Sequence, residues 1–204
     1  MDVSATQRAG NLLLDLPDGW FVLEADPSAR RAALVADVET WASEAVDRVA
    51  HCDELVEILS GFGNEADEMG AVFTAVFWEP GEYGPTVANL MVFEGERSAP
   101  GSGEAEVAAA LRTLAQPDLH DHGPRDVSEQ HLPIGPAARV RFLASSPGDR
   151  DNGGATLVLD ATQVWIPLTG EPPMLVVSGT TPCLIAGDAV AGVVDAVAAS
   201  LRHA

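Results

Sequence analysis

The chain of 204 residues contains no lysine, and its 31 aspartate and glutamate residues outnumber 11 arginines, which gives a formal net charge of −20 at pH 7. Without an ε-amino group, Schiff-base catalysis, the lysine of a phosphate-binding P-loop and a kinase-type ion pair are all excluded. A surface this negative repels nucleic acid and anionic lipid, so we expect neither a nucleic-acid partner nor a membrane partner.

The length and a hydrophobic content of 47% fit a single domain over residues 1–204, whose core needs neither disulfides nor metals. Residues 1–15 lack the pattern of a signal peptide, and we expect them to form a flexible N-terminus. No apolar run approaches the ~20 residues that span a bilayer. These features predict a cytoplasmic protein. Two isolated cysteines in such a protein are more often small buried side chains than a disulfide, and we expect this of Cys52 and Cys183.

Strand-like and helix-like patterns alternate along the chain. A turn leads into a short strand, a long helix follows, and two strands then form a hairpin. A second helix precedes four more strands and a closing helix. The expected strands are 20–23, 71–78, 87–93, 127–132, 138–143, 156–166 and 174–179, and the later helices are 104–115 and 188–201.

The long first helix is expected to begin after Asp26 and Pro27, an N-cap aspartate followed by proline in the first turn. Apolar residues recur at spacings of three and four from Leu34 to Leu59, which predicts one continuous buried stripe. Because such a helix is long for a globular protein, we expect a break near residues 51–53 and an end at 61–64.

The order β-α-β-β-α-β-β-β-β-α, with loops of hairpin length between most strands, predicts the α+β class. We expect a largely antiparallel sheet of six to seven strands flanked by helices. The segment 71–78 is apolar on both faces, which is typical of a central strand covered on each side.

Three segments resemble the PsbP-like α/β/α sandwich: the opening Leu-Pro-Asp-Gly-Trp at 16–20, the strand that ends in Gly-Thr-Thr-Pro at 179–182, and the closing helix with Ser-Leu-Arg at 200–202. That superfamily includes an extrinsic photosystem subunit, a nuclear-import factor that binds the Ran GTPase, and bacterial lipoproteins and secretion chaperones. The long acidic first helix departs from part of this group. The resemblance implies a fold and a binding role, and it transfers no site residues.

One candidate metal site is the segment with Asp118, His120 and His122. On an extended backbone these three side chains would point to one side, where two imidazoles and a carboxylate suit zinc and leave a position for an activated water. The alternative is a solvated polar loop between Pro117 and Pro124. We favour the loop, and we therefore expect no metal and no other cofactor.

Residues 149–154, together with Asp160, partially match a calcium-binding EF-hand loop. The residue types on both flanks predict strands, however, and Asn152–Gly153 is a strong hairpin turn signal. We favour the hairpin, which would place Arg141 roughly opposite Asp160 as a cross-strand partner.

An acidic stretch from Asp37 to Glu68 holds ten carboxylates and one arginine, Arg48. The solvated face of an amphipathic helix accounts for much of this excess. As a functional surface, it would attract a cationic protein or peptide with an association rate that falls as salt rises. The candidate partner-binding residues are Glu44, Asp47, Asp53, Glu54 and Glu57.

Searches for a catalytic nucleophile find none. There is no G-x-S-x-G motif, S-x-x-K requires the missing lysine, and Cys52 lies on an apolar stripe that stabilises a thiolate poorly. Nothing in the sequence places a histidine beside Cys183. Gln163 is polar among the apolar positions of its strand, so it needs a hydrogen-bond partner, lines a pocket or caps an edge strand.

We therefore predict a non-enzymatic binding or adaptor module that recognises a protein or peptide through its sheet face or its acidic helix. The rival hypothesis is a small metal-dependent enzyme that uses Asp118, His120 and His122, with Glu79 or Glu82 as a further group. A third hypothesis is a subunit of a homo-oligomer whose interface uses an uncovered strand.

Overall fold

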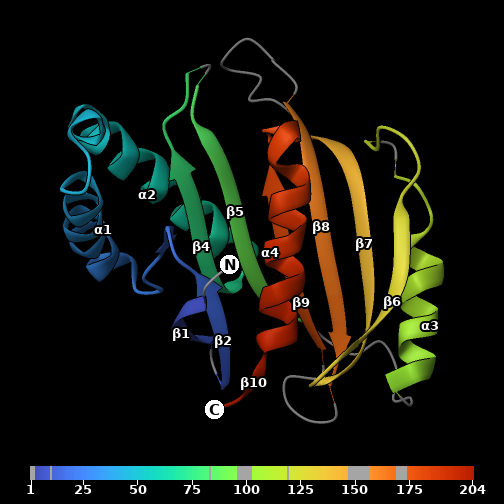
Figure 1. Cartoon of the computed structure of the whole chain (residues 1–204). Helices are drawn as coiled ribbons and strands as arrows, with labels where there is room; N and C mark the ends of the chain where they lie inside the picture. Colours follow the sequence, from blue (N-terminus) through green and yellow to red (C-terminus); the bar gives the residue numbers. More distant parts are fainter. Residues whose placement is uncertain are drawn as a thin grey trace.

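The computed structural model describes residues 3–9, 11–82, 84–95, 103–118, 120–146, 157–168 and 174–204. Across these ranges the fold is α+β, with helices packed on antiparallel sheets (Figure 1). The helices are α1 (Pro27–Ala42), α2 (Cys52–Met69), α3 (Gly103–Leu114) and α4 (Gly187–Ser200), with short 3-10 helices η1 (Val46–His51) and η3 (Leu184–Ala186). None of the described helices is both long enough and apolar enough to cross a membrane.

Among the described residues, a seven-stranded sheet has the order β3-β4-β5-β9-β8-β7-β6, and every neighbouring pair is antiparallel. The predicted fold class is confirmed, and the order of elements largely follows the prediction. The strands are β3 (Trp20–Val22), β4 (Ala71–Glu79), β5 (Thr86–Gly95), β6 (Asp126–Leu132), β7 (Gly135–Ser146), β8 (Leu157–Pro167) and β9 (Met174–Thr181).

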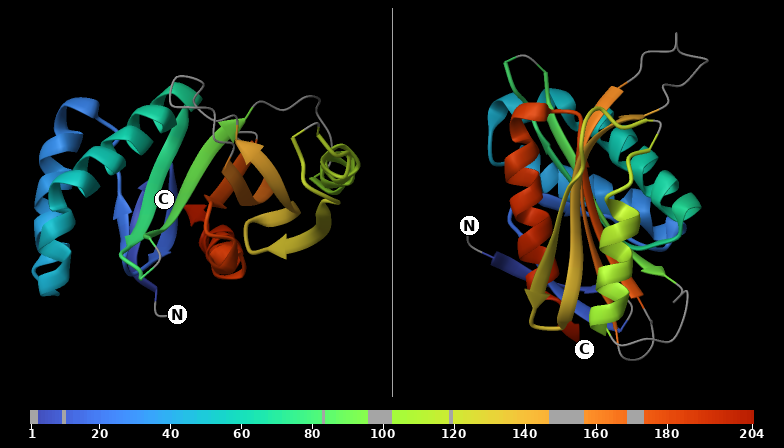
Figure 2. Two further views of the ribbon diagram at one scale, coloured as in Figure 1. Left: turned by 90° about the horizontal axis from the view of Figure 1, so that it is seen from above. Right: turned by 90° about the vertical axis from the view of Figure 1, so that its right-hand side faces the viewer.

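Helices cover both faces of the sheet: α4 lies on one face, while α2 and α3 lie on the other (Figure 2). Because side chains alternate along a strand, β4 contributes to two cores. Ala75 packs in the core under α4, whereas Val76 and Trp78 pack under α1 and α2. On β8, Val164 faces α4 and Trp165 faces α3. Segment 71–78 is therefore apolar on both faces because helices cover both, as predicted.

The N-terminal segment differs from the flexible tail that we expected. Strands β1 (Val3–Ala9) and β2 (Leu12–Pro17) form a hairpin, and β10 (Arg202–His203) pairs with the other edge of β2. Three alternating side chains of β2 are fully or almost fully buried in the core under α4, namely Leu12, Leu14 and Leu16. Arg202 donates to Asp15 at 2.9 Å, which ties the two ends of the chain together.

The predicted long helix is two helices. The break, expected near residues 51–53, starts earlier than expected, at Ser43, and extends to the predicted position, where α2 begins at Cys52. The end of the second helix lies elsewhere than expected. The first helix stops at Ala42, and η1 separates it from α2. Helix α2 passes through 61–64 and ends at Met69, followed by Gly70 with a φ of 75° that non-glycine residues rarely adopt. Gly63 does not end the helix because it serves packing: a Cβ there would lie 2.7 Å from Cδ of Arg30.

Candidate functional site

Among the described residues of the segment proposed as a metal site, one β-bridge forms, between Asp121 and Ala144, while His120 lies in a turn and His122 in a bend. There, the His122 amide donates to Leu143 O at 2.7 Å, and His120 O accepts from the Ser145 amide at 2.8 Å. Asp118 lies on the far side of a turn, whose Asp121 amide donates to Asp118 O at 3.2 Å. Within the ranges that the structure describes, no group of three His, Cys, Asp or Glu side chains could hold a metal ion. The structure therefore does not bring together the ligands that the rival enzyme hypothesis needs.

Asp121, which the sequence did not single out, organises this loop. Its carboxylate accepts from Arg125 Nε at 2.6 Å and from the Asp118 amide at 2.8 Å. The side chain is only 2% exposed. The hydrogen bond from Arg125 is the main cause that lowers the pKa of Asp121, against a smaller opposing effect of burial. The group is held ionised, as a structural carboxylate.

His122 and Ser145 resemble a catalytic base and nucleophile, because His122 Nε2 is hydrogen-bonded to the Ser145 hydroxyl. A base beside a hydroxyl is the first requirement of nucleophilic catalysis, and a third group that orients the base is the second. No described acidic side chain contacts the other ring nitrogen of His122, and the pair borders neither of the two cavities described below. The pair therefore lacks the setting of a catalytic centre.

Asp160 has the partner that the sequence predicted. Arg141 donates to its two carboxylate oxygens at 3.0 and 2.6 Å, and donates to Asp188 at the start of α4 at 2.6 Å. The strand register places Thr162 opposite Arg141, so the pairing with Asp160 is diagonal. These bonds raise the pKa of Arg141. The remaining part of the calcium-loop motif, 149–154, lies outside the described residues.

Other polar groups from the sequence have structural settings. Cys52 and Cys183 are free, half-buried thiols, and the Cys52 thiol lies 3.9 Å from Arg48 O. Gln163 Oε1 accepts from Trp165 Nε1 at 3.2 Å, which supplies the partner that a polar residue at this position requires.

The five predicted partner-binding carboxylates divide between the α1–α2 interface and the η1 junction. Asp53 and Glu57 line a groove between the helices, where Glu57 accepts from Arg31 at 2.7 Å. Glu54 lies 3.9 Å from His51 Nδ1, and Glu44 accepts from Arg48 at 2.7 Å. The side chain of Asp47 lies outside the described part of the structure.

The groove between α1 and α2 has a volume of about 220 Å³. Its apolar lining comes from both helices, with Val35 39% exposed. Among the described residues, neither the Glu39 nor the Asp53 side-chain carboxylate on its rim has a hydrogen-bond or ion-pair partner. The groove therefore presents apolar surface beside free negative charge. Its lining residues are Arg31, Val35, Val38, Glu39, Cys52, Asp53, Val56 and Glu57.

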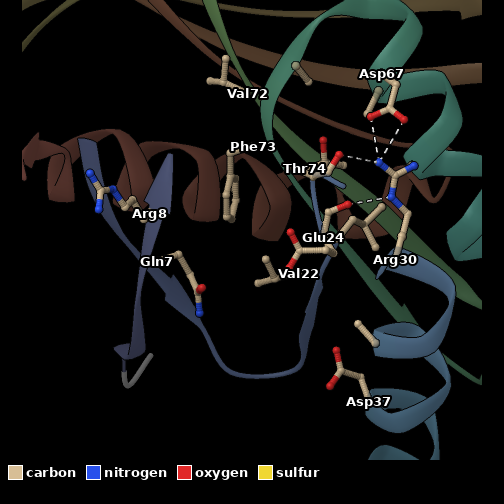
Figure 3. A pocket seen from close by; sticks show the side chains of 16 residues that line it. Gln7, Arg8, Val22, Glu24, Arg30, Asp37, Asp67, Val72, Phe73 and Thr74 are labelled. Atoms are coloured by element: carbon tan, nitrogen blue, oxygen red, sulfur yellow. Dashed lines mark hydrogen bonds and ion pairs between the residues drawn. The ribbon is translucent and has the colours of Figure 1, made fainter. Parts of the chain in front are cut away.

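A larger cavity, of about 390 Å³, lies where β1, the end of β3 and the start of β4 meet α1 and α2 (Figure 3). Its volume falls within the range of ~300–1,000 Å³ that is usual for small-ligand sites. Apolar side chains such as Val22, Val72 and Phe73 form much of its wall. The charged and polar side chains at its boundary come from five segments, namely β1, the residues before α1, α1, α2 and β4: Gln7, Arg8, Glu24, Arg30, Asp37, Asp67 and Thr74.

Arg30 fixes one end of this cavity and is only 4% exposed. Its Nε donates to Glu24 O at 2.8 Å, and its Nη2 donates to the Asp67 carboxylate oxygens at 2.8 and 3.0 Å (Figure 3). The guanidinium packs against Gly63, and its Nη1 is buried without a partner in the described structure. Arg30 thereby joins α1 to α2 and neutralises Asp67.

Two carboxylates of the cavity remain without a partner among the described residues, Glu24 and Asp37. Both side chains are directed toward the open space in Figure 3. Partial burial raises the pKa of Asp37, and no cation acts against this effect. The wall formed by α1 and the segment before it is therefore electronegative and in part desolvated.

Comparisons with protein-family models, with curated proteins and with solved structures found no match to this chain. The resemblance to the PsbP-like sandwich stays a prediction. A fold alone does not assign a function, so the geometry and chemistry of the two cavities carry more weight than the fold.

Proposed function

We propose that this protein is a cytoplasmic, non-enzymatic binding module that recognises a basic, partly apolar segment of a protein or peptide on α1 and α2. The observation that supports it most is that both cavities bordering α1 combine an apolar wall with carboxylates that have no described partner. A basic segment with apolar side chains complements such a surface in both charge and hydrophobicity.

The charges and the apolar lining have different tasks in this proposal. Exposed carboxylates raise the association rate and select against acidic partners, and salt screens their effect. Burial of apolar surface, including the 39% exposed Val35, supplies affinity that salt does not remove. Binding should therefore weaken with salt but persist in part.

A direct test uses a labelled amphipathic peptide of leucine and lysine, about four helical turns long, and a second peptide in which glutamate replaces lysine. We expect the lysine peptide to bind, with an affinity that falls roughly tenfold between about 0.05 and about 0.3 M salt. We expect no binding of the glutamate peptide. Fluorescence anisotropy measures both.

A matched pair of variants separates this surface from general attraction to an acidic protein. One double variant, Glu39→Lys with Asp53→Lys, reverses the charge of these two residues on the groove rim. The control double variant, Asp126→Lys with Glu129→Lys, makes the same change in net charge at exposed positions of β6. The groove variant should lose about tenfold in affinity, a loss of ~1.4 kcal/mol, and the β6 variant less than about threefold. Equal losses in the two variants, or no binding of the lysine peptide to the unmodified protein, would contradict the proposal.

A further inference from the structure

We infer that the larger cavity binds a primary ammonium group on an aliphatic stem, as in a lysine side chain of the partner. This inference rests on the proposed function, because the lysine would belong to the same basic segment that contacts α1 and α2. The inference names the chemical group that the partner inserts and the cavity that receives it, whereas the proposed function specifies only a basic, partly apolar segment.

The charges around the cavity leave room for one cation on its α1 side. Arg30 and Asp67 neutralise each other at 2.8 Å. Arg8 lies on the β1 wall and makes an interaction of its own. The side-chain carboxylates of Glu24 and Asp37 then remain without a partner among the described residues, and both point into the open space (Figure 3). A bound ammonium group would give these two carboxylates their missing counter-charge.

The environment of Asp37 supports the same conclusion. Burial raises its pKa above the ordinary value, which means that the surrounding structure penalises the ionised form. Asp37 nevertheless remains exposed while it lines the cavity, so a ligand can reach its carboxylate. Interaction with a cation inside the cavity would offset the penalty and lower the pKa again.

The shape of the site favours an alkylammonium group over a guanidinium group. Glu24 precedes α1, whereas Asp37 lies within that helix, so their carboxylates reach the cavity at two separate points along the same wall. An ammonium group has three donors that rotate freely, while a guanidinium group binds best in one plane. Val22 and Phe73 offer apolar contact for the methylene stem, and the Gln7 carboxamide on the β1 wall adds a polar contact.

The composition of the chain limits the source of the ligand. Because none of the 204 residues is lysine, neither this chain nor a second copy of it can supply a lysine side chain. The group must come from another molecule. Two sources remain, a lysine of a partner protein and a free aliphatic amine. We assign the former because the second groove also borders α1 and α2 and offers apolar surface with unpaired carboxylates to the rest of a basic segment.

Nα-acetyl-lysine methylamide is the probe that tests this assignment, with binding followed by amide shifts in two-dimensional ¹H–¹⁵N NMR. We expect a Kd on the order of 1 mM, with shifts concentrated at Gln7, Glu24 and Asp37. The Nε-acetylated form of the same compound should cause none of these shifts. Equal shifts with the neutral form would overturn the inference.

Asp37→Asn should weaken binding of the probe at least about fivefold, which corresponds to ~1 kcal/mol. Glu65→Gln is the matched control, since it removes one charge at an exposed position of α2 that lines neither cavity, and it should change binding less than twofold. Circular dichroism checks that both variants fold. Retention of full affinity by Asp37→Asn, or tighter binding of free 1,5-diaminopentane than of the lysine derivative, would contradict a lysine site.

The two proposals fail separately. If the leucine–lysine peptide binds the groove and the lysine derivative leaves the cavity residues unshifted, the inference is wrong and the proposed function stands. If the peptide also fails to bind, the proposed function is wrong as well.

Discussion

The two halves of the main sheet use charged residues differently. In the half with β6, β7, β8 and α4, arginines donate to buried or half-buried carboxylates: Arg141 to Asp160 at 2.6 Å and Arg139 to Asp195 at 2.8 Å. In the half covered by α1 and α2, Arg30 and Arg48 are also paired, but carboxylates are in excess, and Asp37 has no described partner. The same residue types thus hold the fold together in one half and leave unpaired carboxylates among the described residues of the other.

The largest effect is expected where a partnered carboxylate is lost. Asp160→Asn removes the charge that Arg141 contacts through two nitrogens, and Asp160 is 6% exposed. We expect the free energy of unfolding to fall by about 3 kcal/mol, measured by urea denaturation. Asp53→Asn is the control in the other half, and it should change stability by less than about 0.5 kcal/mol. Similar losses in both variants would remove the contrast between the halves.

The next effect concerns the close approach of α1 and α2. Gly63→Ala puts a methyl group 2.7 Å from Cδ of Arg30, whose hydrogen bonds to Glu24 O and Asp67 restrict its movement. We expect a loss of about 2 kcal/mol in the free energy of unfolding. Gly61→Ala is the matched control, because a Cβ at Gly61 meets nothing within 4 Å and alanine favours the helix. A neutral Gly63→Ala variant would show that Arg30 is loosely held.

A smaller, pH-dependent effect is expected at Asp121. Its pKa lies below the ordinary value of 3.8, so its interactions stabilise the protein above that value and are lost as pH falls through the lower, folded-state pKa. Asp121→Asn should therefore cost about 1–2 kcal/mol at pH 7 and less at the acid end of the range. Urea denaturation at several pH values measures this difference. A loss that does not depend on pH would contradict the ionic role of Asp121.

The smallest effect on stability, with the opposite sign, is expected at Asp37. Its pKa is raised above 3.8 by burial, so stability that is present below this pH falls as pH rises through the folded-state pKa. Asp37→Asn should remove that fall and leave stability at pH 7 equal to or slightly above that of the unmodified protein, within about 0.5 kcal/mol. A clear loss of stability would mean that Asp37 has a structural partner and is not a free binding group.

Much of the fold was predictable because local pattern and packing agree. Both faces of 71–78 are apolar since helices cover both, and the stripe of the last helix faces the sheet. The hairpin β1–β2 was missed although Leu12, Leu14 and Leu16 alternate like a strand, because Asp15 and Pro17 interrupt the apolar pattern. The end of α2 was misplaced because glycine often ends a helix. At Gly63, glycine instead leaves space for the side chain of Arg30, which is distant in the sequence.

The candidate site was predictable only in outline. An acidic surface on the first helices follows from composition, and Asp53 and Glu57 do line the groove. The cavity joins Gln7, Glu24, Asp37 and Phe73, which come from three elements and one connecting segment whose arrangement in space no local pattern reveals. The Arg30–Asp67 pair, which leaves Asp37 as a free charge, likewise depends on how two helices pack.

The most direct test of the contrast between the halves is ¹H–¹⁵N NMR mapping of the leucine–lysine peptide on the unmodified protein. The account predicts that amide shifts concentrate on α1, α2 and the cavity wall at Gln7, and that β6, β7 and α4 stay unchanged. Shifts centred on β6, β7 or α4 would place the binding surface in the half where carboxylates already have partners, and would contradict the account.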